Sequence, residues 1–190
     1  MSTLMVDFIT SLDSFGEAEG WPGYWGMEGP EYLDWIGRDE EETHTTLLGA
    51  ATYRTLSGFA ADMPDDPGLA AMTASPKIVF SSTLEAPLSW DNTELIDGDA
   101  VEAVREMKER EAAPMRTVGS LSLSRALLAA GLADRLRVVI FPVLTGATGK
   151  GRLFDGYPDV SLELVDTRTF DGRLQLLEYV PTVLDAPPAR

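Results

Sequence analysis

The sequence predicts an α/β fold of three layers, in which helices cover both faces of a mostly parallel β-sheet. Segments typical of strands alternate with segments typical of helices over most of the 190 residues, and this alternation is characteristic of parallel sheets buried on both faces. Near the C-terminus, two strand-like segments flank Asp171-Gly172. Because Asp-Gly is a strong hairpin turn signal, the sheet is expected to end in an antiparallel hairpin.

The predicted strands are short, apolar and bounded by turn residues. They span residues 4–12, 45–48, 77–80, 93–96, 115–118, 135–142, 161–170 and 173–180. The predicted helices have recognisable ends: one begins at Pro30, which suits the first helical position, and another ends before Gly131. The helices are expected over 30–36, 52–59, 99–111 and 121–130, and residues 13–29, 62–68 and 146–151 are expected to form loops.

The length favours a single domain, because domains commonly have about 100–200 residues. We assign residues 1–180 to this domain and 181–190 to a Pro-rich tail. No apolar stretch is long enough to span a membrane, and no basic region precedes the first apolar segment, so the expected location is cytoplasmic. The chain has no Cys and one His, which excludes thiolate and multi-His metal sites.

The net charge of −16 argues against nucleic acid and anionic membranes as partners, because both require basic surfaces. The charge is uneven: residues 1–70 carry −12 and residues 71–190 carry −4. An ordinary solubilising surface explains this. If the acidic part lines the substrate side, however, phosphorylated substrates should be disfavoured, modestly and in a salt-sensitive manner.

Three strand-to-helix turns are candidates for binding a ligand, because open α/β sheets bind ligands at the carboxyl ends of their strands. The first contains Gly49 and Thr52, and the second runs from Val118 to Ser122 around Gly119. Each has a glycine before a predicted helix, whose free N–H groups suit an anion. The third is the hydroxyl-rich turn 81–84. Any one of these is also ordinary turn chemistry.

The ordered set of stretches FITSLDSF, LLGAATYRTLSGF, PKIVFSSTLEAPLSWDNTELIDGD, VGSLSLSRALLAAGLADRLRVVIFPVLTG and GRLF resembles the dihydrofolate reductase superfamily. It is most similar to the reductase domain at the C-terminus of the bifunctional riboflavin-biosynthesis deaminase/reductase. The resemblance covers roughly residues 4–155. It implies a dihydrofolate reductase-like fold with an eight-stranded mixed sheet, a bound NADPH (NADH being possible), a small-molecule substrate and a homodimer.

The resemblance also implies roles for individual residues. The turns at Gly49 and Gly119 match those that hold the cofactor phosphates in the family. The turn 81–84 matches the loop beside the adenosine ribose. The end of the first strand matches the segment that lies near the nicotinamide and the substrate. The implied cofactor-binding residues are Gly49, Thr52, Ser81, Ser82, Thr83, Leu84, Val118, Gly119, Ser120, Leu121 and Ser122. Many relatives have Arg where this chain has Ala50 and Ser82, and glycine where it has Ser14.

On the substrate side, Asp13 is the candidate catalytic and substrate-orienting residue, since it follows the first strand. Asp also caps turns, so a structural role stays open. Trp25 and Tyr24 are candidates for stacking on a flat heterocycle, although loop aromatics commonly anchor on the core. Glu31 and Tyr32 lie where dihydrofolate reductases have the helix with a substrate-binding carboxylate. A solvated helix face is the ordinary reading of Glu31.

The reaction implied by the resemblance is hydride transfer from NAD(P)H to a small heterocyclic or sugar-derived substrate. The family's riboflavin-pathway step is reduction of the ribose of 5-amino-6-(5-phosphoribosylamino)uracil. The alternative is a non-catalytic or repurposed nucleotide-binding protein on the same fold, since fold alone does not decide function. Dihydrofolate reduction is disfavoured because no unambiguous substrate carboxylate is in place.

Overall fold

In a computed structural model, the chain is described over residues 2–21, 25–40, 43–110 and 113–186. The strands are β1 (Leu4–Ser11), β2 (Phe15–Ala18), β3 (Thr45–Gly49), β4 (Lys77–Phe80), β5 (Thr93–Ile96), β6 (Met115–Val118), β7 (Arg135–Phe141), β8 (Gly149–Arg152), β9 (Val160–Phe170) and β10 (Leu174–Val183). The helices are α1 (Pro30–Glu40), α2 (Ala50–Asp62), α3 (Pro67–Ala74), α4 (Ala100–Arg110) and α5 (Leu121–Ala129).

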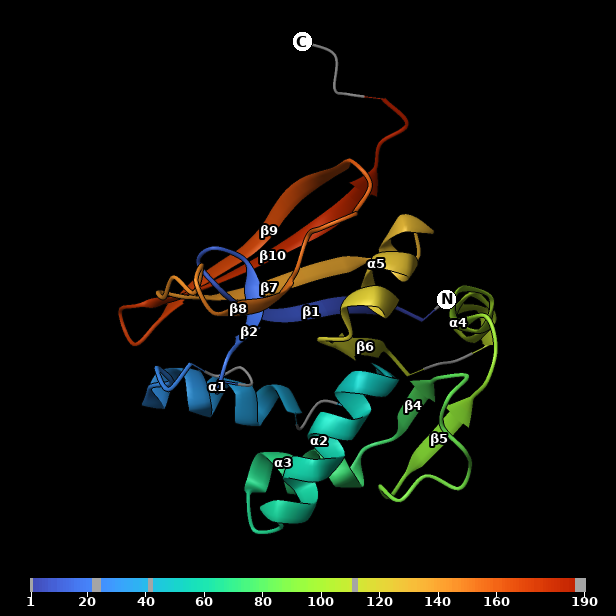
Figure 1. The fold of residues 1–190 in the computed structure, drawn as a ribbon. Coiled ribbons are helices and arrows are strands. Elements are labelled where there is room, and N and C mark those ends of the chain that lie inside the picture. The colour runs from blue at the N-terminus through green and yellow to red at the C-terminus, as the bar shows by residue number, and fades with distance from the viewer. Residues whose placement is uncertain (1, 22–24, 41–42, 111–112, 187–190) are drawn as a thin grey trace.

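Eight of the described strands form one sheet in the order β5-β4-β3-β6-β1-β7-β10-β9 (Figure 1). The neighbours from β5 to β7 are parallel, whereas β10 is antiparallel to both β7 and β9. This confirms the predicted mixed sheet with a C-terminal hairpin. The turn residues Asp171 and Gly172 both have positive φ, 51° and 64°, a conformation that Asp-Gly favours, and the Arg173 N–H closes the turn by donating to the Phe170 carbonyl at 2.9 Å.

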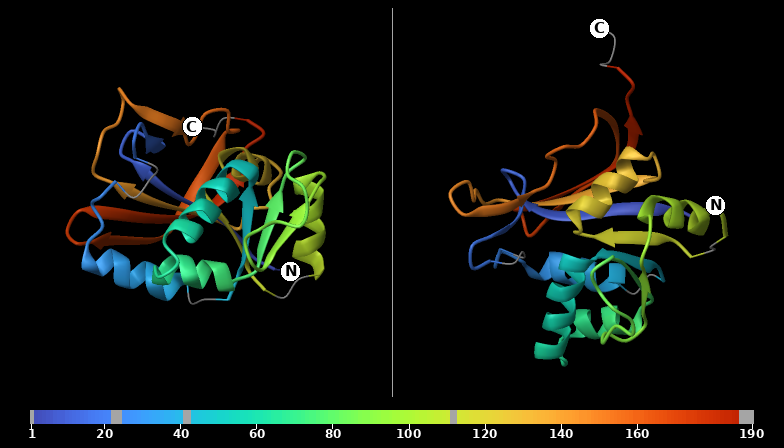
Figure 2. Two further views of the ribbon diagram at one scale, coloured as in Figure 1. Left: turned by 60° about the horizontal axis from the view of Figure 1, so that its bottom comes forward. Right: turned by 45° about the vertical axis from the view of Figure 1, so that its right-hand side comes forward.

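Helices cover the two faces of the sheet, as Figures 1 and 2 show. Leu47 and Leu48 are consecutive on β3 and both fully buried, yet they belong to different apolar clusters. Leu47 packs with residues of α4 and α5, such as Val104, whereas Leu48 packs with Tyr53 of α2. Because consecutive strand residues point to opposite faces, both faces of β3 are covered. The predicted three-layer α/β/α arrangement is confirmed.

A small second sheet was not predicted, because residues 13–29 and 146–151 were expected to be loops. It consists of β2 and β8, which pair antiparallel. The ring of Phe15 lies against the backbone of Gly149, where an added Cβ would come within 2.5 Å of the ring. The pairing therefore requires glycine at a position 134 residues away from Phe15.

Two further differences concern the ends of elements. Residues 62–68 were expected to be a loop, but Pro67 begins α3 and the Asp66 carboxylate caps it by accepting from the Leu69 N–H at 2.9 Å. The predicted tail also begins later than 181, because β10 continues to Val183 opposite Val160. Proline is compatible with this strand end, where β10 has passed the last residue of β7 that it pairs with. Among the described residues, no helix is both long and apolar enough to cross a membrane.

The turn between β9 and β10 is hydrogen-bonded to the N-terminus of α1, which lies far from it in the sequence. The Asp171 carboxylate accepts from the backbone N–H groups of Glu31 (3.1 Å) and Tyr32 (3.2 Å), and the Glu31 carboxylate accepts from the Asp171 N–H (2.6 Å). Gly29 makes room for this contact, because an added Cβ would lie 2.1 Å from the Asp171 side chain. The interaction works as a reciprocal capping box whose two halves are 140 residues apart.

Replacing Asp171 with Ala should lower the free energy of unfolding by about 1–2 kcal/mol, because two helix N–H groups lose their acceptor. Urea denaturation measures the change. Glu163→Ala, at an exposed position of the same hairpin, is the control and should change stability little. Equal stability of Asp171→Ala and the parent protein would show that water replaces the cap without cost.

Candidate functional site

The three predicted turns and Asp13 lie at one edge of the sheet. In the order β4-β3-β6-β1-β7, adjacent parallel strands end at Phe80, Gly49, Val118, Ser11 and Phe141. The predicted residues follow these ends directly. Within the sheet, β6 lies between β3 and β1. The chain leads from β3 to β4 on one side of this point and from β6 to β7 on the other, so its connections run in opposite directions. Such switch points are where α/β folds bind ligands.

The turns at Gly49 and Gly119 are bonded to each other. The Ser120 hydroxyl accepts from the Gly49 N–H at 3.0 Å, and the Thr52 hydroxyl accepts from the Ser120 N–H at 3.2 Å. Gly119 has φ 57° and Ser120 has φ 54°, so two consecutive residues are in the left-handed region. An added Cβ at Gly119 would meet nothing closer than Thr52, at 3.9 Å. The glycine is thus required by backbone conformation rather than by crowding.

The helices that follow these turns lack a side-chain cap. Neither Gly49 at the start of α2 nor Ser120 at the start of α5 caps its own helix, and neither helix has an acidic residue in its first turn. By contrast, carboxylates of Asp171, Asp66 and Asp99 accept from the first N–H groups of α1, α3 and α4. Two unneutralised helix N-termini side by side suit a diphosphate group. The residues present therefore fit a dinucleotide cofactor.

The hydroxyl-rich turn after β4 is organised by its first residue. The Ser81 hydroxyl accepts from the N–H groups of Thr83 (3.1 Å) and Leu84 (3.2 Å). It is therefore used within the turn, and Ser82 and Thr83 are the exposed hydroxyls. These two remain candidates for the ribose of a cofactor, and neither brings a positive charge.

Asp13 lies just beyond the end of β1 and is held by two neighbours. Its carboxylate accepts from the Ser11 hydroxyl at 2.7 Å, and both its oxygens lie 3.1 Å from the amide nitrogen of Thr145 in the loop after β7. The Ser11 hydroxyl, and next the Thr145 N–H, lower the pKa of Asp13 below its ordinary value of 3.8. At neutral pH it is a carboxylate, which can accept a substrate N–H but holds no proton to donate.

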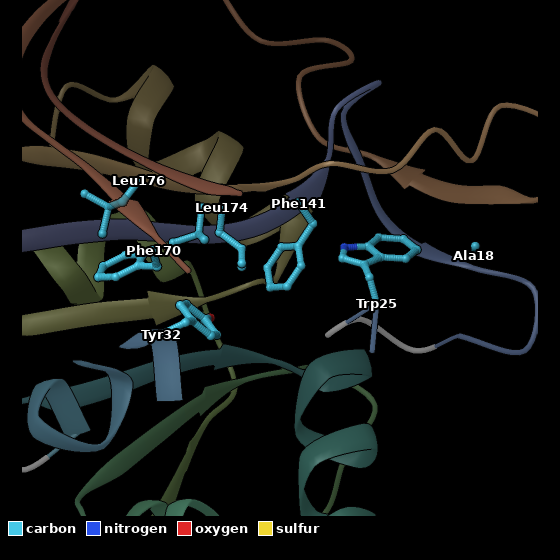
Figure 3. Close-up of a cluster of buried hydrophobic side chains, with 8 residues drawn as sticks. Ala18, Trp25, Tyr32, Phe141, Phe170, Leu174 and Leu176 are labelled. Carbon is cyan, nitrogen blue, oxygen red and sulfur yellow. The ribbon is translucent and has the colours of Figure 1, made fainter. Parts of the chain in front are cut away.

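The three other predicted substrate residues are placed elsewhere. Trp25 and Tyr32 are 1% and 0% exposed and belong to an aromatic cluster with Phe141 and Phe170 (Figure 3). Neither ring has a face open to a substrate. The prediction that these residues contact the substrate is therefore wrong, and both pack in the core. The Glu31 carboxylate accepts from the Asp171 N–H, so it is not a free carboxylate at the carboxyl ends of the strands. Tyr24 lies outside the described residues.

Many relatives have Arg at the positions of Ala50 and Ser82. Two basic residues of this chain that lie near these turns in the sequence, Lys77 and Arg125, form other contacts in the structure. Lys77 is buried, and its amine donates to the carbonyls of Met72, Thr73 and Ser75 at the end of α3. Burial lowers the pKa of this lysine to about 8. Lys77 lies at the amino end of β4, whereas the candidate turns lie at the carboxyl ends of the strands. It therefore cannot reach a ligand bound at those turns. Arg125 donates to the Asp155 carbonyl at 2.9 Å.

Sequence reasoning missed two features near Asp13. Thr145 is one, because nothing in the sequence links it to a carboxylate 132 residues earlier. The other is strand β8, which pairs Lys150 with Glu17 and Arg152 with Phe15. Basic side chains therefore lie next to the acidic N-terminal part, immediately beyond β1. The surroundings of Asp13 are therefore not uniformly acidic.

A hollow of about 790 Å³ lies away from this edge, on the α1 face near the beginnings of β1, β6 and β7. Several of its lining side chains form ion pairs: Arg137 with Asp7 (2.6 Å) and Arg168 with Asp166 (2.9 Å). Because the hollow lies at the beginnings of the strands and not at their carboxyl ends, we do not assign the site there. In the part of the chain that the structure describes, no group of three or more acidic or His side chains is placed to hold a metal.

The chain is similar to one protein family and to several solved structures. Residues 2–176 match the RibD C-terminal domain family. A protein assigned to riboflavin biosynthesis from Shewanella sp. PV-4 is similar with a TM-score of 0.72 and 18% identity, over 95% of this chain and 99% of that one. A pyrimidine reductase-like protein from Corynebacterium diphtheriae gives a TM-score of 0.61 and 15% identity, over 95% and 92%.

A longer structure is also similar. The diaminohydroxyphosphoribosylaminopyrimidine deaminase/5-amino-6-(5-phosphoribosylamino)uracil reductase from Thermotoga maritima gives a TM-score of 0.65 and 17% identity, over 95% of this chain. This chain spans 57% of its length. No curated protein sequence matches the chain. At these identities the structures establish a shared fold.

Proposed function

The chain belongs to the RibD C-terminal domain family, and we propose that it is a nicotinamide-dependent reductase of a pyrimidine with a sugar-derived side chain. The family and its structural neighbours support a reductase role. The proposed donor is NADPH, with NADH as the other candidate. The proposed substrate is 5-amino-6-(5-phosphoribosylamino)uracil or a close relative, because the Thermotoga maritima protein is named for that reduction.

NAD(P)H supplies the hydride when it is bound. In net terms the hydride adds to ribose C1, the bond from C1 to the ring oxygen breaks, and that oxygen gains a proton. The proposed role of the N-termini of α2 and α5 is to bind the diphosphate with backbone N–H groups. Asp13 accepts an N–H of the pyrimidine and orients it. Because Asp13 is ionised, the proton comes from solvent or from the substrate itself.

The observation that best supports this proposal is the pair of uncapped helix N-termini joined by Ser120. Of the five helices described, α2 and α5 follow the turns at Gly49 and Gly119 and have no side-chain cap. The N-termini of the other three helices are capped by carboxylates. A carboxylate at a helix N-terminus stabilises the fold. Its absence from these two adjacent helices leaves a place for a ligand anion.

The first experiment is a fluorescence titration with NADPH and with NADH, followed by turnover of the phosphoribosylamino-pyrimidine and of its dephosphorylated form. We expect NADPH and NADH both to bind with micromolar affinity. We also expect little discrimination between the two donors, because the exposed hydroxyls of Ser82 and Thr83 bring no cation to a 2′-phosphate. Absence of binding at millimolar concentrations of both would refute the proposal.

The alternative is a nucleotide-binding protein that has lost catalysis. Ala50 and Ser82 favour it, since many relatives have Arg at these positions, and a neutral residue lacks the charge-assisted bonds that hold a phosphate. Binding of NADPH without turnover of either pyrimidine would support this alternative. Turnover with retained NADPH binding would exclude it.

A further inference from the structure

We propose that Ser120 and Thr52 are positioning residues, whose hydroxyls join the turns at Gly49 and Gly119 into one rigid binding unit. The proposal rests on the proposed function, in that the ligand of the unit is the nicotinamide cofactor. It differs from the expectation that these hydroxyls contact the cofactor phosphates themselves. Their hydrogen-bond partners in the structure are protein groups.

The N–H and the hydroxyl of Ser120 together make three hydrogen bonds. Its N–H donates to the Thr52 hydroxyl (3.2 Å), and its own hydroxyl accepts from the Gly49 N–H (3.0 Å) and donates to the Val118 carbonyl (3.2 Å). The residue is 9% exposed, so its hydroxyl faces inward rather than toward a ligand. Through its hydroxyl and its N–H, this one residue thus connects the end of β6, the end of β3 and the first turn of α2.

The backbone of Ser120 explains why so many bonds are needed. Its φ and ψ are 54° and 58°, a left-handed conformation that residues with a Cβ adopt at a cost. Gly119 before it is left-handed as well. Such conformations persist where the surroundings over-determine them, and they gather at functional sites. Here the three bonds keep Ser120 left-handed and so direct the first N–H groups of α5 outward beside those of α2.

The consequence is that the two helix N-termini act together. A diphosphate bridges two sites only if their spacing is fixed, because a displacement of about 1 Å in a positioned group is costly to a ligand that must be held precisely. The bridge fixes the Gly49 turn to the Gly119 turn beyond the last residues at which β3 and β6 pair with each other, Leu47 and Thr117. Loss of either hydroxyl should therefore weaken cofactor binding by displacing the two helix N-termini from each other.

The test compares Ser120→Gly, Ser120→Ala, Thr52→Val and Thr52→Ser for NADPH affinity, thermal stability and amide exchange of Gly49 without cofactor. We expect Ser120→Gly, Ser120→Ala and Thr52→Val to bind NADPH about 5- to 20-fold more weakly, the scale of one or two lost hydrogen bonds. Thr52→Ser keeps the acceptor and should bind as the parent does. Thr55→Val, one turn along α2 at an exposed position, is the matched control and should also bind normally.

Stability separates a positioning role from a merely structural one. Ser120→Gly should be more stable than Ser120→Ala, since glycine adopts the left-handed conformation freely, yet both should bind NADPH equally weakly. The Gly49 amide should exchange slowly in the parent and fast in both Ser120 variants and in Thr52→Val. Affinity that simply follows stability, or unchanged affinity in Ser120→Gly and Thr52→Val, would overturn the inference. Failure of the parent to bind NADPH would instead refute the proposed function, and the exchange measurement would still report on the bridge.

Discussion

Replacing Gly119 with Val should weaken NADPH binding by at least about 100-fold while leaving the helix content nearly unchanged. Gly119 has φ 57°, a conformation that is costly for any residue with a Cβ and most costly for a β-branched one. The turn must therefore rearrange, and with it Ser120 and the first N–H groups of α5. A shift of about 1 Å in such groups is enough for a loss of this size.

The measurement is the fluorescence titration with NADPH, together with circular dichroism. Gly131→Ala is the control, because Gly131 also has a positive φ, 68°, but lies after the C-terminus of α5, away from the carboxyl edge. It should lower stability without changing affinity. If Gly119→Val binds NADPH as tightly as the parent, the turn at Gly119 is not the phosphate site.

The main sheet could be predicted because its strands are dense apolar segments with clear boundaries. β4, β5 and β6 have the predicted bounds, and each is followed or preceded by Gly, Asp, Ser or Pro. The ribbon of β2 and β8 could not be predicted, since each strand is four residues long and contains glycine. Their pairing brings the Phe15 ring against Gly149, a contact between distant segments that no local sequence pattern predicts.

The candidate site could be predicted at the level of which turns meet, but not in where their side chains point. Glycine before a helix is a local signal, and the parallel sheet brings Gly49 and Gly119 to one edge. The inward direction of the Ser120 hydroxyl depends on a left-handed backbone that is rare for serine. Likewise, α1 has an amphipathic pattern, but which of its residues face the core depends on Asp171, which fixes its first turn from 140 residues away.

A similar point explains a departure from the family at the end of β1. Ser14 occupies the position where the usual motif has glycine, and its φ is 68°. The family glycine is thus explained by a left-handed turn, which this chain forms with a serine. The turn is closed by the Ser14 N–H donating to the Ser11 carbonyl at 3.0 Å, and it places the Asp13 carboxylate within reach of both Ser11 and Thr145.

Replacing Asp13 with Asn should lower kcat/KM for the pyrimidine substrate by about 10- to 100-fold, without weakening NADPH binding. The carboxylate is the charged acceptor at the end of β1, and a neutral amide forms weaker hydrogen bonds to a substrate N–H. Because the pKa of Asp13 lies below 3.8, this carboxylate stays ionised from pH 5 to 8. No rate change in that range should therefore arise from its titration. Acid should lower the rate only as the pH falls toward the lowered pKa.

Ser11→Ala separates the chemical role of Asp13 from its structural role. The Ser11 hydroxyl donates to Asp13 and accepts from the Phe15 N–H at 3.0 Å, so its loss frees the carboxylate without removing the charge. The pKa of Asp13 should then rise toward its ordinary value, since the main cause of its lowering is gone. The acid limb of the rate profile should move to higher pH, while the rate at pH 7 falls less than in Asp13→Asn. If instead Asp13→Asn retains full activity and only unfolds more easily, Asp13 serves to tie β1 to the loop after β7, and the substrate is oriented by other groups.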